Sequence, residues 1–261
     1  MKNKLLTIIL ILIFAAGVCL LLYPKFSDYW NSLHQTKAIS HYVEAVNDLD
    51  DDICACLFEE AAAYNRSLDL RTNVYHLTGA QEEQYPALLN IGGDGVMGFI
   101  EIPLIKVSLP ICHGTSAKVL QTAVGHVEWT GLPVGGEGVH CVLSGHRGLP
   151  SSRLFTDLNK LSVGDLFYIS VLNETFVYQV EQILIVEPND ASALVPQPGR
   201  DLCTLVTCTP YGVNSHRMLV RGVRTDPEET PVAVHVSADA IPIEPVFVAV
   251  VLFVLLMLLL L

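Results

Sequence analysis

Cys208 and Arg217 are the residues whose types and spacing most clearly suggest chemistry. Cys208 ends an apolar, β-branched run at residues 204–208 (Thr-Leu-Val-Thr-Cys), and Arg217 follows nine residues later at the start of a second apolar run. A thiol at a strand end is open to a cleft yet held by a rigid scaffold. A nearby guanidinium favours the nucleophilic thiolate and can stabilise a developing oxyanion. The pair therefore predicts part of a cysteine acyl-transfer site.

A histidine would complete such a site by moving protons. His146 is the best candidate, because it stands where an apolar strand gives way to a glycine-flanked turn, the same kind of location as Cys208. On local sequence alone, an ordinary turn histidine is an equally good interpretation. His216 is adjacent to Arg217, and neighbours on a strand point to opposite faces, so the two should not face one site. Three further histidines have no distinguishing context: His113, His126 and His140.

These residues resemble the Thr-Leu-x-Thr-Cys…Arg signature of sortases, the cysteine transpeptidases of Gram-positive cell surfaces. The resemblance covers residues 94–224 closely. Its motifs occur in order at residues 95–98 (Gly-Val-Met-Gly), 109–111 (Leu-Pro-Ile), 113–116 (His-Gly-Thr-Ser), 132–136 (Leu-Pro-Val-Gly-Gly), 143–150 (Leu-Ser-Gly-His-Arg-Gly-Leu-Pro), 154–158 (Leu-Phe-Thr-Asp-Leu) and 208–212 (Cys-Thr-Pro-Tyr-Gly). The last motif, the preceding helical segment and a second apolar chain end resemble class C, the pilin-polymerising sortases.

The resemblance implies a mainly β fold, a closed eight-stranded β-barrel with N-terminal helices and a transmembrane helix at each end. It implies Cys208 as nucleophile, His146 as general acid/base, and Arg217 as the cation that positions substrate and supports the oxyanion. The implied partners are pilin subunits. A sorting signal like Leu-Pro-x-Thr-Gly would be cleaved between Thr and Gly, and the Thr joined to a Lys amine of another pilin. No metal or organic cofactor is implied.

Other functions remain open at this point. The nearest is a sortase of another class, which attaches proteins to peptidoglycan and uses a cell-wall precursor as acceptor. A non-enzymatic membrane-anchored scaffold with an inert Cys208 is more remote. A thiol oxidoreductase is weaker still, because the Cys-x-x-Cys spacing is missing.

Both ends of the chain are apolar. Residues 5–22 carry no charge and follow Lys2 and Lys4, and residues 241–261 form a second apolar run. Each is long enough to cross a hydrocarbon core of about 30 Å as a helix. We favour a retained signal-anchor over a cleaved signal peptide, because a small-x-small cleavage site is lacking. A lipid on Cys19 is disfavoured because Val18 is bulkier than lipoprotein processing tolerates and the apolar run continues past the cysteine. The basic flank then puts the N-terminus in the cytoplasm, which predicts a membrane protein with an extracellular catalytic domain.

The formal net charge is −12, and with apolar ends this acidity belongs to the middle of the chain. An acidic domain argues against nucleic acid as a partner. Outside the first apolar run, disulfides are possible in an exported chain, although their connectivity cannot be deduced from sequence. The cysteines concerned are Cys54, Cys56, Cys112, Cys141, Cys203 and Cys208.

The sequence predicts six parts: a signal-anchor (1–25), a helical segment (26–68), a connecting segment at the position of a lid (69–90), the barrel (91–225), a linker (226–240) and a C-terminal transmembrane helix (241–261). Within the barrel, β-branched and aromatic runs predict strands at 98–102, 105–111, 139–144, 166–171, 175–187, 203–208 and 218–224. Residues 152–161 are predicted to be the one helix there. Strand parity places Cys203 on the face opposite Cys208, which predicts a structural role for Cys203.

The connecting segment departs from the class C pattern. Class C members usually carry a lid with an Asp-Pro-aromatic motif ahead of the barrel, and residues 69–90 contain no Asp-Pro. Tyr75, His76 or Tyr85 could substitute for the aromatic anchor, but each is equally well interpreted as a packing residue. The sequence therefore predicts a shorter or absent lid and a more open site.

Overall fold

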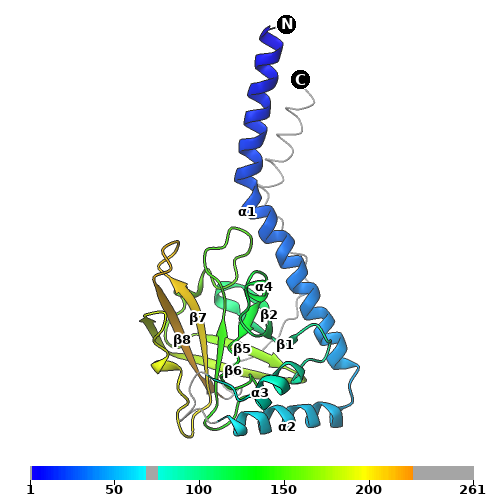
Figure 1. Ribbon diagram of the computed structural model, residues 1–261, viewed down its shortest axis with the longest axis vertical. Coiled ribbons are helices and arrows are strands. Elements are labelled where there is room, and N and C mark those ends of the chain that lie inside the picture. The colour runs from blue at the N-terminus through cyan, green and yellow to red at the C-terminus, as the bar shows by residue number, and fades with distance from the viewer. Residues whose placement is uncertain (1, 69–75, 226–261) are drawn as a thin grey trace.

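The computed structural model describes residues 2–68 and 76–225, which form a β-barrel with a helical N-terminal arm (Figure 1). The predicted linker at 226–240 and the C-terminal transmembrane helix at 241–261 lie outside the described residues. The helices are α1 (Lys2–Asn47), α2 (Asp51–Ser67), α3 (Gly79–Gln84) and α4 (Ala117–Leu120), with short 3₁₀ turns at Tyr85–Ala87, Pro103–Ile105, Leu158–Lys160 and Ser192–Leu194. The strands are β1 (Val96–Ile102), β2 (Val107–His113), β3 (Val124–His126), β4 (His140–Ser144), β5 (Leu166–Val171), β6 (Glu174–Val186), β7 (Leu202–Thr209) and β8 (His216–Thr225).

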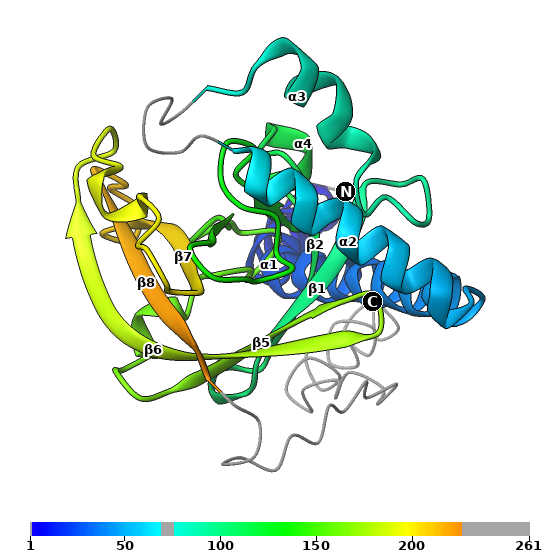
Figure 2. The same cartoon turned by 90° about the horizontal axis from the view of Figure 1, so that it is seen from below.

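The strands close into a barrel in the order β1-β2-β3-β4-β7-β8-β6-β5. The pairs β2–β3 and β4–β7 are parallel, and the others are antiparallel. Figure 2 shows the barrel from below, with α2 and α3 crossing one side of it. The predicted closed eight-stranded barrel is confirmed.

Alternate residues of each strand fill the barrel. The rings of Phe167 and Tyr178 stack inside it with centroids 5.4 Å apart. Gly222 lies beneath them, where a Cβ would come within 2.6 Å of the Phe167 ring, so this position requires glycine. Cys141 and Cys203 face each other across β4 and β7 and are fully buried, which confirms that Cys203 points away from the face of Cys208.

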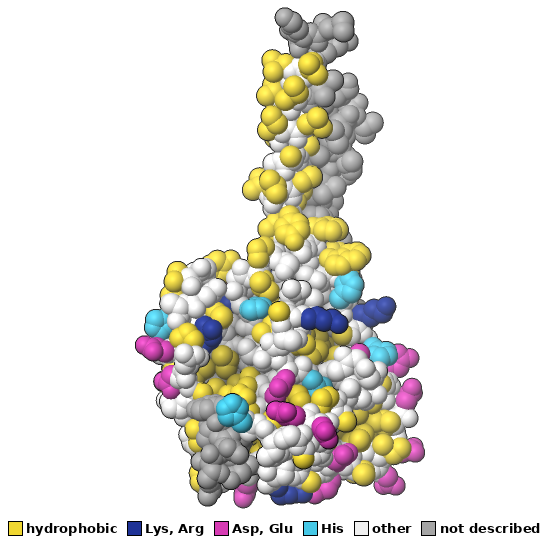
Figure 3. Space-filling model, viewed as in Figure 1, with side chains coloured by type: hydrophobic (Ala, Val, Ile, Leu, Met, Phe, Trp, Pro, Cys, Tyr) yellow, Lys and Arg dark blue, Asp and Glu magenta, His cyan; other side chains and the backbone are white. Residues whose placement is uncertain are grey.

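Helix α1 is continuous from the apolar run into the barrel domain, so the predicted boundary at residue 25 is not a break in the helix. Pro24 lies in its interior, where the missing amide donor favours a bend, and α1 changes direction part-way along its length in Figure 1. By length and composition, Leu5–Asn47 is a candidate membrane span. Apolar side chains cover the projecting part of α1, whereas acidic side chains gather over the barrel domain (Figure 3).

Buried hydrogen bonds fasten both long helices to the barrel. The Tyr42 hydroxyl, from α1, donates to the carbonyl of Met97 at 3.1 Å and accepts from the amide of Leu172 at 2.8 Å. The Asn65 amide, from α2, pairs in the same two-way manner with the backbone of Leu132. Leaving any of these buried groups unpaired would cost about 1–3 kcal/mol, so the arm is an integral part of the domain.

Two features differ from the sequence prediction. The predicted helix at 152–161 is wrong: these residues form turns and a single 3₁₀ turn, Leu158–Lys160. Residues 76–90, the described part of the connecting segment, also contain helical turns that the sequence analysis does not predict. Thr78 caps α3 in a capping box with Gln81, and the following 3₁₀ turn buries Tyr85. The Tyr85 hydroxyl bonds to His126 Nδ1 at 3.0 Å.

Candidate active site

The parallel pairing of β4 with β7 brings His146 and Cys208 to the same edge of the barrel. Ser144 lies opposite Val206, and the amide of Gly145 donates to the carbonyl of Val206 at 3.0 Å. The hydroxyl of Thr207 donates to the carbonyl of Gly145 at 2.8 Å. His146 and Cys208 are therefore each one residue beyond a bonded pair, on two strands that end side by side.

The antiparallel pairing of β7 with β8 puts Arg217 directly opposite Cys208. Strand parity places both side chains on the outer face of the barrel, and His216, which is opposite Thr209, alternates to the other face. The Arg217 guanidinium donates through Nη1 to the carbonyls of Asn214 and His216, at 3.3 and 3.1 Å. The guanidinium charge is thus held where the β7–β8 connection enters β8, beside a partly exposed Cys208.

The loop after β4 fixes the backbone of His146. The amide of Phe155 donates to the His146 carbonyl at 3.1 Å, and the amide of Gly148 donates to the Thr156 hydroxyl at 3.1 Å. Phe155 is fully buried against Gly145, where a Cβ would lie 2.6 Å from the ring. The returning segment of this loop therefore sets the position of the histidine.

The same loop contacts the β7–β8 hairpin. Arg147 donates to the Thr209 hydroxyl at 3.2 Å. Gly148 adopts φ +79°, and the space where its side chain would lie is filled by the ring of Tyr211. Both segments lie at the end of the barrel that faces the N-terminal part of α1 (Figure 1). The structure thus assembles all three residues of the predicted site, Cys208, His146 and Arg217, from the ends of three neighbouring strands.

Two further groups of side chains share the outer face with Cys208. Val206 belongs to an apolar cluster built on Val142, Leu194 and Leu219. One step further along β7, the Thr204 hydroxyl bonds to His140 Nε2 at 2.7 Å. From the sequence, strand parity indicates that Thr204 and Val206 share a face with Cys208. The sequence alone does not reveal the apolar cluster, because the cluster also requires residues of β4 and β8, which pair with β7.

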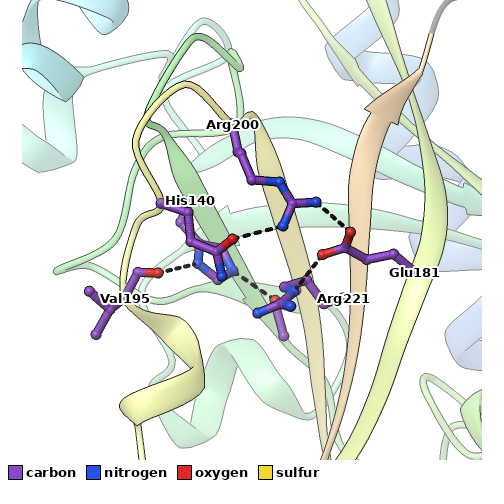
Figure 4. Close-up of polar contacts among 7 residues, drawn as sticks. His140, Glu181, Val195, Arg200 and Arg221 are labelled. Atoms are coloured by element: carbon purple, nitrogen blue, oxygen red, sulfur yellow. Dashed lines mark hydrogen bonds and ion pairs between the residues drawn. The ribbon is translucent and has the colours of Figure 1, made fainter.

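Charged residues surround His140 (Figure 4). Glu181 forms ion pairs with Arg200 and with Arg221, the latter at 2.8 Å. Burial would raise the pKa of Glu181, but the hydrogen bonds and charges of the two arginines lower it. Arg200 also bonds to Gln197 in the β6–β7 connection, so the network ties this connection to the sheet.

Burial lowers the pKa of His140 to about 4, so this residue stays neutral in the folded protein near neutral pH. The unfolded chain, with a histidine pKa of about 6.5, binds the proton first as the pH falls. The free energy of unfolding therefore has its full contribution from neutral His140 above about pH 6.5. This contribution is lost as the pH falls towards 4, at up to about 1.4 kcal/mol per pH unit.

We expect the free energy of unfolding of the wild type to fall more steeply between pH 6.5 and 4.5 than that of His140→Gln. Urea unfolding at several pH values measures both slopes. Equal slopes would contradict a neutral, buried His140.

The lid prediction is partly tested. Tyr85 is a packing residue, and His76 is exposed, while Tyr75 lies outside the described residues. A more open site stays a prediction.

Deleting residues 74–79 should leave the rate of Cys208 alkylation by a small thiol reagent within about twofold of the wild-type rate, since the reactivity of a thiol follows its accessibility. A large rise on deletion would reveal a lid.

Within residues 2–68 and 76–225, no group of three His, Cys, Asp or Glu side chains is arranged to hold a metal ion, and no cysteine there forms a disulfide. Cys208, His146 and Arg217 can support nucleophilic catalysis by a thiol, with the histidine for proton transfer and the guanidinium for charge stabilisation.

Comparisons with known proteins agree on one family. The sortase domain model matches residues 100–225. Sortase C1 of Streptococcus agalactiae is 49% identical, with 73% of this chain and 98% of that chain covered and a TM-score of 0.70. Sortase C of Streptococcus pneumoniae, whose structure was described with reference to catalysis and pilin substrate specificity, is 39% identical, with 73% and 97% covered and a TM-score of 0.66. Sortase D of Bacillus subtilis is 32% identical over 130 residues, and this chain spans 63% of its length. The chain therefore belongs to the sortase family of cysteine transpeptidases, and its structural neighbours are class C sortases.

Proposed function

We propose that this protein is a membrane-anchored, pilin-specific sortase that joins pilin subunits through isopeptide bonds outside the cell. One observation carries the proposal: Arg217 on β8 lies opposite Cys208 on β7, and His146 lies two residues beyond the end of the neighbouring β4, in a chain whose structural neighbours are class C sortases. The apolar N-terminal half of α1 supports the membrane anchor.

In the first half-reaction, the Cys208 thiolate attacks the Thr carbonyl of a sorting signal like Leu-Pro-x-Thr-Gly. Arg217 stabilises the oxyanion of the tetrahedral intermediate. The intermediate collapses by breaking the Thr–Gly amide bond, and His146 gives a proton to the departing Gly amine. The product is a thioester between Cys208 and the pilin.

In the second half-reaction, a Lys amine of another pilin attacks the thioester carbonyl. His146 accepts a proton from this amine, and the Cys208 thiolate departs. One thioester bond is broken and one isopeptide bond is formed, so the enzyme is regenerated without an external reductant or energy source.

The apolar cluster on the outer face supports a substrate with apolar residues ahead of the cleaved bond. It includes Val142 and Val206, and Val206 is two residues from Cys208 on the same face. We expect the Leu and Pro of the sorting signal to contact this cluster, because burying apolar surface there is favourable.

Polymerisation of a purified pilin tests the proposal. Incubating wild-type enzyme in detergent with pilin alone should produce a ladder of covalent oligomers on a denaturing gel. A thioester that forms but turns over only when a cell-wall precursor is supplied would instead assign the protein to peptidoglycan anchoring. Absence of any thioester or product would reject both.

Arg217 should matter through its planar guanidinium as well as its charge. We expect Arg217→Ala to lower kcat/KM for peptide transfer by about 10²–10³-fold, the loss typical of an oxyanion-stabilising donor. The kcat/KM of Arg217→Lys should lie between those of wild type and Arg217→Ala, because lysine keeps the charge but lacks the planar set of donors. His216→Ala, one residue away on the other strand face, is the matched control and should stay within about twofold. Equal losses at positions 216 and 217 would argue for a structural effect on the hairpin.

A further inference from the structure

The helix that leaves the apolar N-terminal run carries three polar side chains on one face, towards the barrel. Asp28, Asn31 and Gln35 are spaced at i, i+3 and i+7, which aligns them along one side of α1. They begin six residues after the uncharged run at 5–22. All three form a hydrogen bond to the same loop of the barrel.

Each of these side chains bonds to one of three consecutive residues, Ser151, Ser152 and Arg153. Asn31 Nδ2 donates to the carbonyl of Ser151 at 2.7 Å. Asp28 Oδ1 accepts from the amide of Arg153 at 2.8 Å. Gln35 Nε2 donates to the Ser152 hydroxyl at 3.1 Å and to the carbonyl of Thr122 at 2.7 Å.

The bond between Gln35 and Ser152 is buried, whereas those of Asn31 and Asp28 are part-buried and exposed. Gln35 and Ser152 are 8% and 3% exposed, so a polar atom left unpaired there would be costly. The segment also has little regular structure of its own, apart from a single bridge between Leu149 and Ser152. Its position therefore depends on what it binds.

This segment is the same loop that holds His146. Two residues beyond Arg153, Phe155 donates to the His146 carbonyl, and Thr156 accepts from Gly148. Hydrogen bonds from α1 to residues 151–153, and from Phe155 to His146, thus connect the helix to the backbone of His146 through one short stretch of chain. The bonding pairs are separated by more than 110 residues in sequence.

We propose that α1 positions the catalytic loop: Asp28, Asn31 and Gln35 are positioning residues that hold His146 for proton transfer. The inference rests on the proposed function of His146 as general acid/base. The membrane-anchoring helix is then part of the active-site scaffold as well as a tether. Misplacement of a catalytic group by about 1 Å can cost up to 10²-fold in rate, so loosening the loop should lower kcat.

The test compares variants of the full chain in detergent micelles, with a sorting-signal peptide and a primary amine as substrates. Asp28→Ala and Asn31→Ala should each lower kcat about tenfold and leave KM within about twofold. Asp28→Asn retains an Oδ1 acceptor for the Arg153 amide and should restore kcat to within about twofold of wild type. Thr36→Ala is the matched control, because its exposed hydroxyl bonds within α1 to the carbonyl of Ser32.

Amide hydrogen exchange supplies a readout that does not depend on activity. Exchange at residues 147–156 should accelerate in Asp28→Ala and Asn31→Ala but not in Asp28→Asn or Thr36→Ala. Unchanged exchange together with unchanged kcat in both alanine variants would overturn the positioning role. So would an Asp28→Asn variant as impaired as Asp28→Ala. Retained activity in His146→Ala would instead reject the proposed function, while the exchange result would still report on the loop.

Discussion

Replacing Cys208 by alanine is expected to abolish both thioester formation and peptide transfer while the barrel remains folded. Cys208 is partly exposed at the end of β7, opposite Arg217, so its thiol is accessible to a substrate carbonyl. Alanine cannot form the covalent bond on which both half-reactions depend. Removing a partly exposed sulfur should change the free energy of unfolding by less than about 1 kcal/mol. Intact-mass spectrometry after incubation with a sorting-signal peptide measures the thioester directly.

Cys203→Ala is the matched control for this variant. Cys203 lies on the same strand but inside the barrel, fully buried opposite Cys141. Burial raises the pKa of the Cys203 thiol, which keeps it protonated and unreactive. The control should form the thioester with kinetics close to wild type, although the small cavity lowers its stability. A thioester mass shift retained in Cys208→Ala and lost in Cys203→Ala would contradict the assignment of the nucleophile.

The strand pattern was largely predictable because β-branched and aromatic runs mark buried strands. All seven predicted strands correspond to strands in the structure, and β5 matches at both ends. β3 was missed because it is only Val124–His126, with a glycine at its centre. It exists through pairing with β2 on one side and β4 on the other, which is information that a short local window does not contain.

Helical periodicity misled at residues 152–161 for a related reason. Leu154, Phe155, Leu158 and Leu161 recur with helical spacing, and all four are buried. In the structure these four side chains are buried from a loop that folds back on the barrel, and not from a helix. Leu154 adopts φ +37°, and the amide of Phe155 donates to His146 instead of continuing a helix. A tertiary hydrogen bond here outweighs local propensity.

The three candidate site residues are predicted from their strand-end positions, and the pairing of β4, β7 and β8 explains why those positions converge. What the sequence did not contain is the contact between α1 and the loop after β4. Asn31 and Ser151 are 120 residues apart, and neither belongs to a motif. Local patterns find residues able to do chemistry, whereas the groups that hold them come from distant parts of the chain.

His146→Ala should lower the rate of peptide transfer by about 10²–10⁴-fold, the usual contribution of a general acid/base. The loss should depend on the leaving group. An amide expels an amine that must be protonated as it departs, whereas a thioester expels a thiolate that leaves with little help. The Phe155 amide holds the His146 carbonyl, and the Phe155 ring packs against Gly145. Because neither contact involves the imidazole, truncating it should leave the loop in place.

Acylation of Cys208 by a peptide thioester and by the matching peptide amide therefore separates chemistry from structure. In His146→Ala, the rate of thioester formation from the amide should fall far more than that from the activated thioester. A variant with a damaged loop would lose both rates in parallel, since substrate positioning would fail for either substrate. If the two substrates lose the same factor, His146 acts on the shape of the site and not on the proton of the leaving amine.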